Sequence, residues 1–174
     1  VKSGVIGKLA GGTNKVLSMG APSIAVVSFT NKAVSNIKSA LPEEFKPHCS
    51  TMHKLVEFKP EDFEEEVLDA YGQETGEVNT TRRFVPTYGT DDNDYGDGLE
   101  LPHLDVIIIE EAGSVPTSLF NILIKALPSH EDTIFIFLGD LNQLPPVFGD
   151  AILGFKLLDL PIVELTKVYR QALL

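Results

Sequence analysis

Residues 134–147, IFIFLGDLNQLPPV, constrain the fold of this chain more than any other stretch. The apolar run at 134–138 is typical of a strand that is buried on both faces of a parallel sheet. It leads directly into Gly139 and Asp140, at the position where open α/β sheets bind ligands, beyond the carboxyl ends of their strands. Gly139 permits a sharp turn, and Pro145-Pro146 stiffens the exit. The pattern predicts a ligand site at this strand end; the alternative is a plain strand followed by a polar turn.

Other apolar runs in the sequence also have the length and composition of buried strands. They lie at residues 23–29 and 104–109, and a last strand is predicted near residues 162–165. Amphipathic helical segments separate the main runs, and a shorter strand-to-helix step is predicted at residues 50–53. Apolar strands that alternate with helices are typical of an α/β fold with a parallel sheet flanked by helices.

Helix-start signals follow two of these strands directly. Thr30 and Asn31 are good N-cap residues, and the segment after them places apolar residues on one helical face. Ser114 is expected to cap the second helix, with Pro116 in its first turn and Pro128 at its end. Each helix is therefore expected to begin at the carboxyl end of a strand.

Residues 57–101 differ from the flanking sequence because they are acidic, rich in turn residues and poor in long apolar runs. Within them, residues 63–71 and 78–88 flank a glycine-containing turn and predict a protruding β-hairpin. Residues 89–98 follow as a flexible loop. That loop is acidic, but it lacks the glutamate in register that an EF-hand needs, so we do not expect calcium.

Length and composition limit the classes of protein to which the chain can belong. Its 174 residues suit one domain, or one domain carrying an insertion. No apolar run approaches the length of a membrane helix, about 18 residues. The N-terminal residues lack a signal-peptide pattern, and the single Cys49 allows neither an internal disulfide nor a CxxC metal motif. We therefore expect a cytoplasmic protein without a membrane partner.

The net charge of −11 is unevenly distributed along the chain. Residues 1–59 contain eight lysines and three acidic residues, a balance of +5. Residues 60–174 contain six basic and 22 acidic residues, a balance of −16. The acidic total argues against non-specific wrapping of nucleic acid. A basic groove could lie in the first third of the chain, although composition alone favours a lysine-rich solvated face there.

Two adjacent carboxylates, Glu110 and Glu111, follow a predicted strand. The first could hold Mg²⁺, and the second could orient or deprotonate a water that attacks a phosphate. Alternatively, both could simply place negative charge at the N-terminus of the next helix. The neighbouring strand that ends in Gly139 and Asp140 favours a nucleotide site over that alternative.

Several stretches together resemble, in the same order, the motifs of superfamily 1 DNA helicases of the RecD and Dda type. Residues 27–37 (VSFTNKAVSNI) and 50–55 (STMHKL) resemble DNA-contacting motifs, and residues 106–115 (VIIIEEAGSV) resemble the Walker B segment. Residues 137–154 with 164–172 resemble the γ-phosphate sensor and the arginine motif. The resemblance implies the first motor domain of such a helicase, with a RecA-like P-loop NTPase fold and an inserted β-hairpin subdomain. It implies ATP and Mg²⁺ as cofactors and single-stranded DNA as partner.

The same resemblance assigns the residues of the nucleotide site. It implies Glu111 as general base, Glu110 as metal ligand, Gln143 as γ-phosphate sensor and Arg170 as the cation on the transferred phosphoryl group. For Arg170, a surface or interdomain ion pair is the alternative. The expected phosphate-binding residues are Gly11, Gly12, Lys15, Gly139 and Asp140.

The phosphate-binding loop departs from the family pattern, GxxxxGK followed by Ser or Thr. In KLAGGTNKV, Asn14 replaces the glycine before Lys15, and Val16 replaces the hydroxyl that binds magnesium. The span 16–23 is also too short for the full helix that normally follows the loop. Glu110 likewise stands where the family usually has aspartate. These departures weaken the expectation of ATP hydrolysis.

On the DNA side, the resemblance implies contacts from Thr30, Asn31, Thr51 and His53. A helix N-terminus at Thr30 and Asn31 would offer a hydroxyl, an amide and free N–H groups to a phosphate without reading sequence. For His53, a structural role is an equal alternative. The inserted hairpin corresponds to the wedge that such helicases use at a duplex fork, with Phe84 or Tyr88 as the stacking residue or as simple packing.

These inferences define one leading hypothesis: an ATP-dependent DNA helicase motor domain of residues 1–56 and 102–174, with a hairpin subdomain of residues 57–101. Replication or recombination proteins are the expected protein partners. The second motor domain that unwinding requires is not among these residues, so we do not expect the chain alone to unwind DNA. The alternative is a helicase-like module that binds DNA or a partner without turnover. A third hypothesis is a different nucleotide-dependent phosphotransferase, but the segment GDLNQLPPV (139–147) argues against it.

Overall fold

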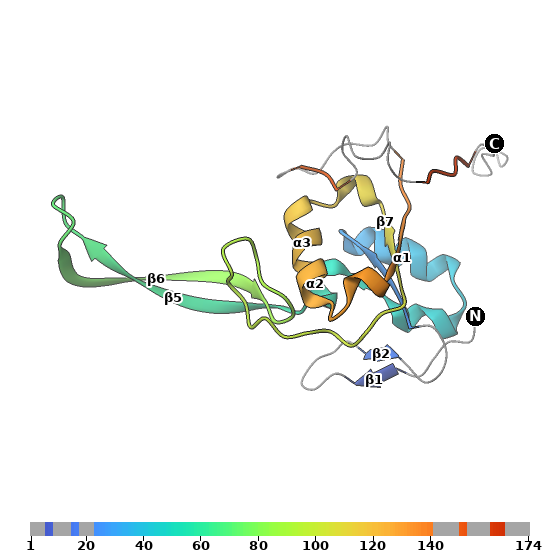
Figure 1. Cartoon of the computed structure of the whole chain (residues 1–174), viewed down its shortest axis with the longest axis horizontal. Helices are drawn as coiled ribbons and strands as arrows, with labels where there is room; N and C mark the ends of the chain where they lie inside the picture. The colour runs from blue at the N-terminus through green and yellow to red at the C-terminus, as the bar shows by residue number, and fades with distance from the viewer. Residues whose placement is uncertain (1–5, 9–14, 18–22, 141–149, 153–160, 166–174) are drawn as a thin grey trace.

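A central parallel sheet carries the fold of this chain. The computed structural model describes residues 6–8, 15–17, 23–140, 150–152 and 161–165 (Figure 1). Within them, a four-stranded sheet has the order β4-β3-β7-β8, and all of its pairings are parallel. Its strands are β4 (Cys49–Thr51), β3 (Ile24–Ser28), β7 (Val106–Glu110) and β8 (Ile134–Phe137). The predicted α/β fold is confirmed.

The carboxyl ends of these strands meet at one edge of the sheet, because the register aligns them. Ser28, the last residue of β3, is paired with Thr51 on one side and with Glu110 on the other. At the next pairing, Ile109 of β7 lies opposite Phe137 of β8. The sheet therefore presents the residues that follow its strands side by side along one edge.

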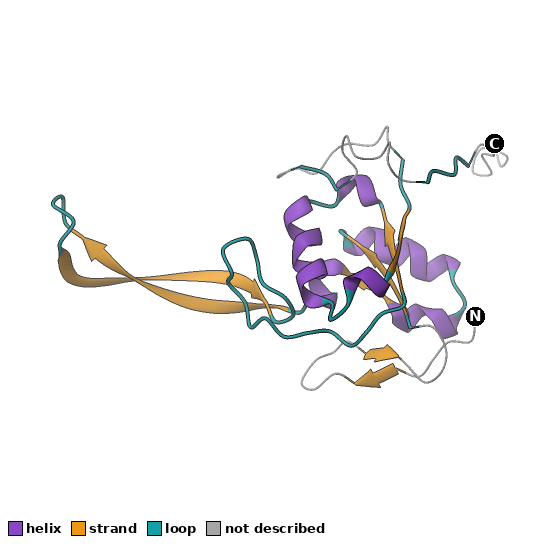
Figure 2. Cartoon of the chain, in the orientation of Figure 1, coloured by secondary structure: helices purple, strands orange, loops and turns teal. Residues whose placement is uncertain are grey.

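Helices lie on both sides of the sheet (Figure 2). The α-helices are α1 (Asn31–Ala40), α2 (Met52–Leu55) and α3 (Thr117–Ala126). Short 3-10 helices lie in the connections between strands and helices: η1 (Glu43–His48), η2 (Ala112–Ser114) and η3 (His130–Asp132). Thr30 caps α1 by accepting a hydrogen bond from the Ala33 N–H, and Thr51 caps α2 by accepting one from the Lys54 N–H. Thr51 is the last residue of β4 and Thr30 lies two residues after β3, and each starts a helix.

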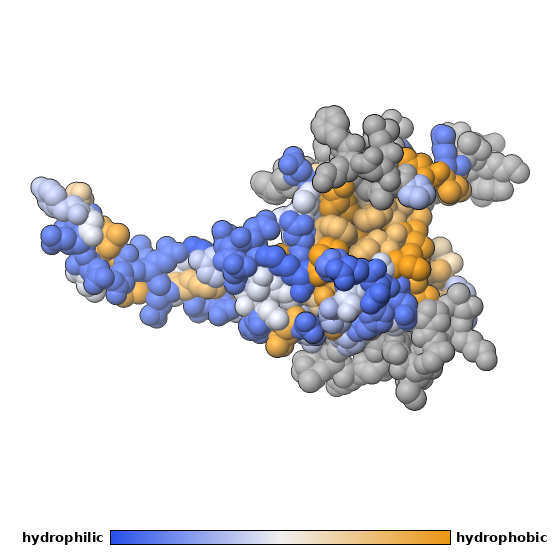
Figure 3. Space-filling view, in the orientation of Figure 1, coloured by the Kyte–Doolittle hydropathy of each residue, from blue (hydrophilic) through white to orange (hydrophobic). Residues whose placement is uncertain are grey.

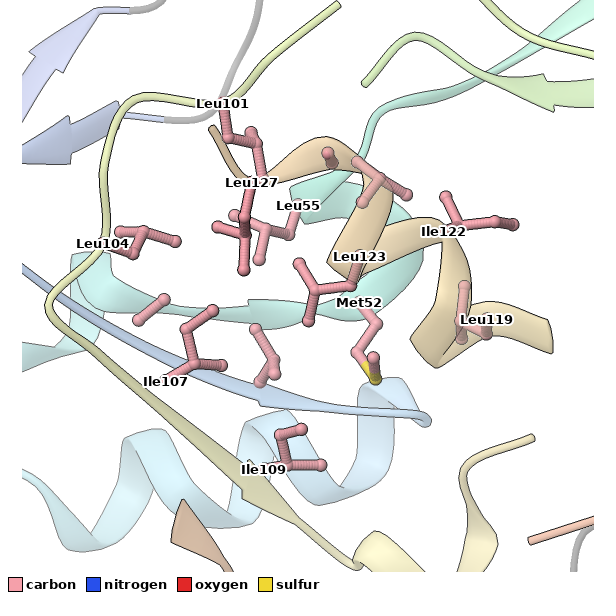
Figure 4. Packing of buried hydrophobic residues seen from close by; sticks show 14 of the residues in the cluster. Met52, Leu55, Leu101, Leu104, Ile107, Ile109, Leu119, Ile122, Leu123 and Leu127 are labelled. Atoms are coloured by element: carbon pink, nitrogen blue, oxygen red, sulfur yellow. The ribbon is translucent and has the colours of Figure 1, made fainter. Parts of the chain in front are cut away.

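The hydrophobic core lies between the sheet and helices α2 and α3 (Figure 4). Ile107 and Ile109 of β7 project into it and are fully buried, as are Leu123 of α3 and Met52 of α2. Alternation along β7 sends Val106, Ile108 and Glu110 to the opposite face. Two buried residues of α1, Ala33 and Val34, lie outside this cluster, which places α1 on that opposite face.

Strand β8 does not match the prediction of burial on both faces. Phe135 and Phe137 pack against Phe120 of α3, with ring centroids 5.5 and 5.9 Å from the Phe120 ring. On the other face, Ile134 and Ile136 remain 62% and 41% exposed. The reason is position: in the described part of the chain, β8 is an edge strand and a helix covers only one of its faces.

The predicted hairpin is present, and its first strand begins five residues earlier than expected, at Phe58 instead of Phe63. Strands β5 (Phe58–Leu68) and β6 (Glu74–Pro86) pair antiparallel and extend away from the rest of the molecule (Figure 1). Its surface is mostly hydrophilic, in contrast to apolar areas on the sheet-containing part (Figure 3). A register shift between Glu66 and Leu68 interrupts the pairing near the tip. A two-stranded ribbon needs support, and residues 89–98 supply it at the base.

Aromatic and charged contacts anchor that base. Phe63 of β5 packs edge-on against Tyr95 at 4.9 Å between centroids, and the Arg83 guanidinium lies over both rings. Lys59 donates to both carboxylate oxygens of Asp97 at 2.8 and 2.7 Å. The loop predicted at 89–98 is therefore packed against one face of the hairpin.

Two local expectations are wrong. Ser114 does not cap a helix: it ends η2, and Pro116 occupies the N-cap position of α3 without a side-chain hydrogen bond. The cause is a left-handed turn at Glu111, which starts η2 before α3 can begin. Residues 161–165 form no strand and are exposed, so the strand expected near 162–165 is absent there.

At the N-terminus, strands β1 (Ile6–Lys8) and β2 (Lys15–Leu17) form a separate antiparallel pair. Among the described residues, no helix combines the length and apolar character needed to cross a bilayer.

Candidate nucleotide and nucleic-acid site

The candidate site residues are sorted along the carboxyl edge of the sheet. The strand order β4-β3-β7-β8 places Thr51 first, then Thr30 with Asn31, then Glu110 with Glu111, and finally Gly139 with Asp140. The residues expected to contact DNA therefore lie on the β4 and β3 half of the edge. Four of those expected at the nucleotide site, Glu110, Glu111, Gly139 and Asp140, lie on the β7 and β8 half. Open α/β sheets bind ligands along this edge.

Backbone hydrogen bonds hold the ends of β7 and β8 together. The Leu138 N–H donates to the Ile109 carbonyl at 2.8 Å, and the Ala112 N–H donates to the Leu138 carbonyl at 2.9 Å. Beyond them, Gly139 passes close to η2: a Cβ there would lie 3.4 Å from the Ala112 nitrogen and 3.6 Å from the Gly113 nitrogen. Gly139 and Asp140 are thus brought beside the turn that carries Glu111.

Glu111 adopts a left-handed backbone conformation, with φ 52° and ψ 42°. This conformation costs a non-glycine residue about 1 kcal/mol or more. Strained residues of this kind concentrate at functional sites, where the surroundings enforce them. Glu110 is the last residue of β7, and the left-handed turn at Glu111 ends the strand and begins η2.

Glu110 ends β7 on the face that α1 covers, and its Oε2 atom is buried. Its strand neighbour Ser28 is fully buried, and the Ser28 hydroxyl makes no hydrogen bond within the described residues. The described side chains form no cluster of three or more His, Cys, Asp or Glu residues that could hold a metal on its own. Mg²⁺ bound by one carboxylate, water and substrate phosphates needs no such cluster. The residues present therefore fit a nucleotide-bound Mg²⁺.

On the DNA half of the edge, the N-terminus of α1 is exposed to solvent. Thr30 and Asn31 are both exposed, and the first-turn N–H groups of a ten-residue helix point outward there. The Thr30 oxygen accepts the cap hydrogen bond from Ala33, so the hydroxyl hydrogen can still be donated to a ligand. Thr51 lies at the neighbouring strand end and is half-buried.

His53 is packed between two aromatic rings. Its ring centroid lies 5.5 Å from that of Phe29 and 5.1 Å from that of Phe58. Burial lowers the pKa of His53 below its ordinary value of 6.5. These contacts support the structural alternative for this residue, and a neutral imidazole attracts phosphate less than an imidazolium would.

The aromatic residues proposed for the hairpin differ in exposure. Phe84 projects from β6 with 68% of its surface exposed. Tyr88 is only 6% exposed and belongs to the hydrophobic core cluster, so it cannot stack on a base pair. The packing alternative therefore holds for Tyr88, and Phe84 is the aromatic that remains available.

One predicted phosphate-binding residue does not lie where the family motif would place it. Lys15 begins strand β2, whereas the phosphate-binding motif would place it at the start of a helix. Gly11, Gly12, Gln143 and Arg170 lie outside the described residues.

Sequence reasoning missed Ser28. It is the second serine of the run SIAVVSF, and its position near the end of a predicted strand was an available signal. Only the register of β3 with β7 shows that it neighbours Glu110.

Comparison with known proteins agrees with this arrangement. A family model described as AAA domain matches residues 2–149. The ATP-dependent RecD2 DNA helicase of Deinococcus radiodurans is 34% identical over 105 residues, which is 58% of this chain and 14% of that protein. The chain thus spans about a seventh of the length of this relative. The match over most of the chain, together with the parallel sheet and the strand-end motifs, shows that the chain belongs to the AAA domain family, as a motor domain of the RecD-like superfamily 1 helicase type.

Proposed function

We propose that this domain is the first motor domain of an ATP-dependent DNA helicase, which couples ATP hydrolysis to movement on single-stranded DNA. The observation that carries the proposal is the sorting of residues along one sheet edge. Carboxylates lie at the ends of β7 and β8, and the exposed α1 N-terminus lies at the end of β3. Strand β3 is the immediate neighbour of β7, so both ligands would contact adjacent segments of one rigid sheet.

In the nucleotide half, Glu110 would hold Mg²⁺, and Asp140 with Gly139 would face the phosphates. Bound Mg²⁺ would neutralise charge on the phosphates. Glu111 would orient the attacking water and take its proton. Its left-handed backbone at the end of β7 supports this role, because strained residues concentrate at functional sites. Gln143, Arg170, Gly11, Gly12 and Lys15 stay predictions for the same site.

In the DNA half, the α1 N-terminus would bind the sugar-phosphate backbone. Thr30 would donate its hydroxyl hydrogen, and Asn31 would offer its amide and backbone N–H. Thr51 would contact the next phosphate along. Contacts of this kind carry no base information, as a motor that moves along any sequence requires.

The hairpin would act as the wedge that separates the duplex, with residues 57–101 as a distinct subdomain. Its length and its projection from the motor domain support this role (Figure 1). Phe84 is the candidate for stacking on the last base pair because its ring is exposed.

The test is phosphate release by the full-length protein with and without single-stranded DNA. We expect DNA to stimulate turnover. Glu111→Gln should lower turnover by about 100-fold or more while nucleotide binding persists. Glu131→Gln is the matched control, because Glu131 is exposed in η3, away from the sheet edge. Unchanged turnover in Glu111→Gln would remove the proposed base.

One observation favours the alternative function, a helicase-like module that binds DNA or a partner without turnover. Lys15 lies in an antiparallel strand pair, and Val16 beside it cannot ligate a metal. Under this alternative, the full-length protein binds a fluorescent ATP analogue but releases no phosphate at any DNA concentration. The two functions are separated by that one measurement.

A further inference from the structure

Ser28 has a polar group that the described structure leaves without a hydrogen bond. The residue is 0% exposed, and its Oγ atom is among the buried side-chain atoms that have no partner in the described part of the chain. A buried hydroxyl in this state loses its hydration without compensation. Buried unsatisfied groups are rare in native proteins, and each needs an explanation such as a bound ion or water.

The other serine at this strand shows how such a group is normally satisfied. Ser23 immediately precedes β3 and is also 0% exposed. Its hydroxyl lies 2.9 Å from the His103 carbonyl oxygen and 3.0 Å from Oδ2 of Asp105. Among the described residues, the serine hydroxyl at the amino end of the strand is thus hydrogen-bonded, whereas the one at the carboxyl end, where the candidate site lies, is not.

The neighbours of Ser28 indicate what is missing. In the register of the sheet, Ser28 is directly paired with Glu110 of β7. Paired residues of parallel strands project to the same face, and neighbouring strands lie about 4.8 Å apart. The Ser28 hydroxyl and the Glu110 carboxylate, whose Oε2 atom is also buried, therefore share one face of the sheet.

We propose that Ser28 is a positioning residue of the metal site: its hydroxyl accepts a hydrogen bond from a water bound to Mg²⁺ beside Glu110. This inference rests on the proposed function, in which Glu110 holds the metal. Mg²⁺ keeps several of its waters when it binds to proteins, and these waters need acceptors. Groups in this outer layer orient the ligands, and their loss typically weakens metal affinity by about 10–100-fold.

The variant Ser28→Ala separates this role from a structural one. Removing a hydroxyl that has no partner should not destabilise the metal-free protein, so we expect a melting temperature in EDTA equal to or above that of the wild type. The Mg²⁺ concentration needed for half-maximal binding of a fluorescent, non-hydrolysable ATP analogue should rise by about 10-fold. Binding of the analogue in EDTA should stay unchanged.

The measurements use the full-length protein, with Glu110→Gln and Ser35→Ala beside Ser28→Ala. Ser35 is exposed in α1, so its variant should match the wild type in every measurement. Glu110→Gln should raise the Mg²⁺ concentration needed for half-maximal binding of the analogue more than Ser28→Ala does.

The results distinguish this inference from the proposed function. If the wild type binds the analogue without any Mg²⁺ dependence, the metal site itself is absent and both fail. If Glu110→Gln shifts the Mg²⁺ midpoint and Ser28→Ala does not, only the role of Ser28 is wrong. A melting temperature of Ser28→Ala in EDTA well below that of the wild type, or failure to fold, would show a structural hydrogen bond and overturn the inference.

Discussion

Ser23 and Asp105 are joined by a hydrogen bond between residues 82 positions apart: the Ser23 backbone N–H donates to Oδ2 of Asp105 at 2.5 Å. The two residues immediately precede β3 and β7, and the pairing of Ile24 with Val106 follows directly. The same register then runs five pairings to Ser28 and Glu110. A polar contact at the amino ends of the strands thus supports the alignment of the site at their carboxyl ends.

Asp105→Ala should destabilise the protein by about 1–3 kcal/mol at neutral pH, because the buried Ser23 N–H loses its acceptor. In the wild type, hydrogen bonds of the Asp105 carboxylate with the Ser23 backbone and hydroxyl hold the pKa of Asp105 below its ordinary value. Since the folded pKa is lowered, this stabilisation is present above about pH 4 and is lost as the pH falls through the folded pKa. Denaturant unfolding of both proteins between pH 3 and pH 7 measures it.

The control is Asp132→Ala, since Asp132 is exposed in η3. Its unfolding free energy should stay within about 0.5 kcal/mol of the wild type. Equal acid sensitivity in the wild type and Asp105→Ala would contradict the assignment.

His53 should make the stability of the protein depend on pH in a second range. Burial lowers its pKa, so the unfolded chain takes up a proton at a higher pH than the folded protein does. The stabilising effect of the neutral ring is complete above about pH 6.5 and is lost as the pH falls toward the lower folded pKa. His53→Gln should remove this dependence, as followed by denaturant unfolding at pH 5 to 8. His130→Gln, an exposed control in η3, should retain it.

Gly89 and Gly72 form a matched pair for backbone strain, with φ values of 72° and 78°. A Cβ at Gly89 would lie 2.4 Å from the Ile122 carbonyl oxygen, whereas one at Gly72 would meet nothing within 4 Å. In both alanine variants, the left-handed conformation should lower the free energy of unfolding by about 1 kcal/mol. Gly89→Ala should lose about 2 kcal/mol more, because the loop must move away from α3. Thermal unfolding of the two variants tests the difference, and equal losses would show that the contact can relax.

Phe84 and Tyr88 should separate function from stability. Phe84→Ala removes an exposed ring, so the unfolding free energy should change by less than about 0.5 kcal/mol. If the hairpin is the proposed wedge, duplex unwinding by the full-length protein should fall while its DNA-stimulated ATP hydrolysis persists. Tyr88→Ala should instead destabilise the fold by about 3 kcal/mol, because its ring is buried. Normal unwinding by Phe84→Ala would exclude this residue from strand separation.

The sequence was most informative about helix starts and the hairpin, because these depend on residues that are close together along the chain. Thr30 and Thr51 follow apolar segments, and both cap helices as their side chains permit. The hairpin was also predictable, because long polar segments around a glycine-containing turn have few other ways to pair. Its first strand begins at Phe58, earlier than predicted, and contacts of Phe63 and Lys59 with residues 95 and 97 stabilise this base. Those contacts are tertiary and leave no local signal.

Local patterns failed where a neighbouring segment decided the outcome. Ser114 has a side chain that suits an N-cap. The left-handed turn at Glu111 starts η2 at Ala112, however, so Ser114 becomes the last residue of η2. The apolar side chains of Ile134 and Ile136 are typical of a strand that is buried on both faces. The described residues leave the face of β8 that carries them exposed. Tyr88 and Phe84 are both aromatic residues close together in sequence, and only the tertiary structure places Tyr88 in the hydrophobic core and leaves Phe84 exposed.

By itself, the sequence determined the alternation of strands and helices, the placement of polar residues after apolar strands and the family to which these motifs belong. These properties follow from local propensity and periodicity, which depend on residues close together along the chain. The tertiary structure alone decided that Ser28 lies beside Glu110 and that the two halves of the site share neighbouring strands. Strand order and register depend on pairing between distant segments, and no local pattern specifies which strand end becomes the neighbour of another.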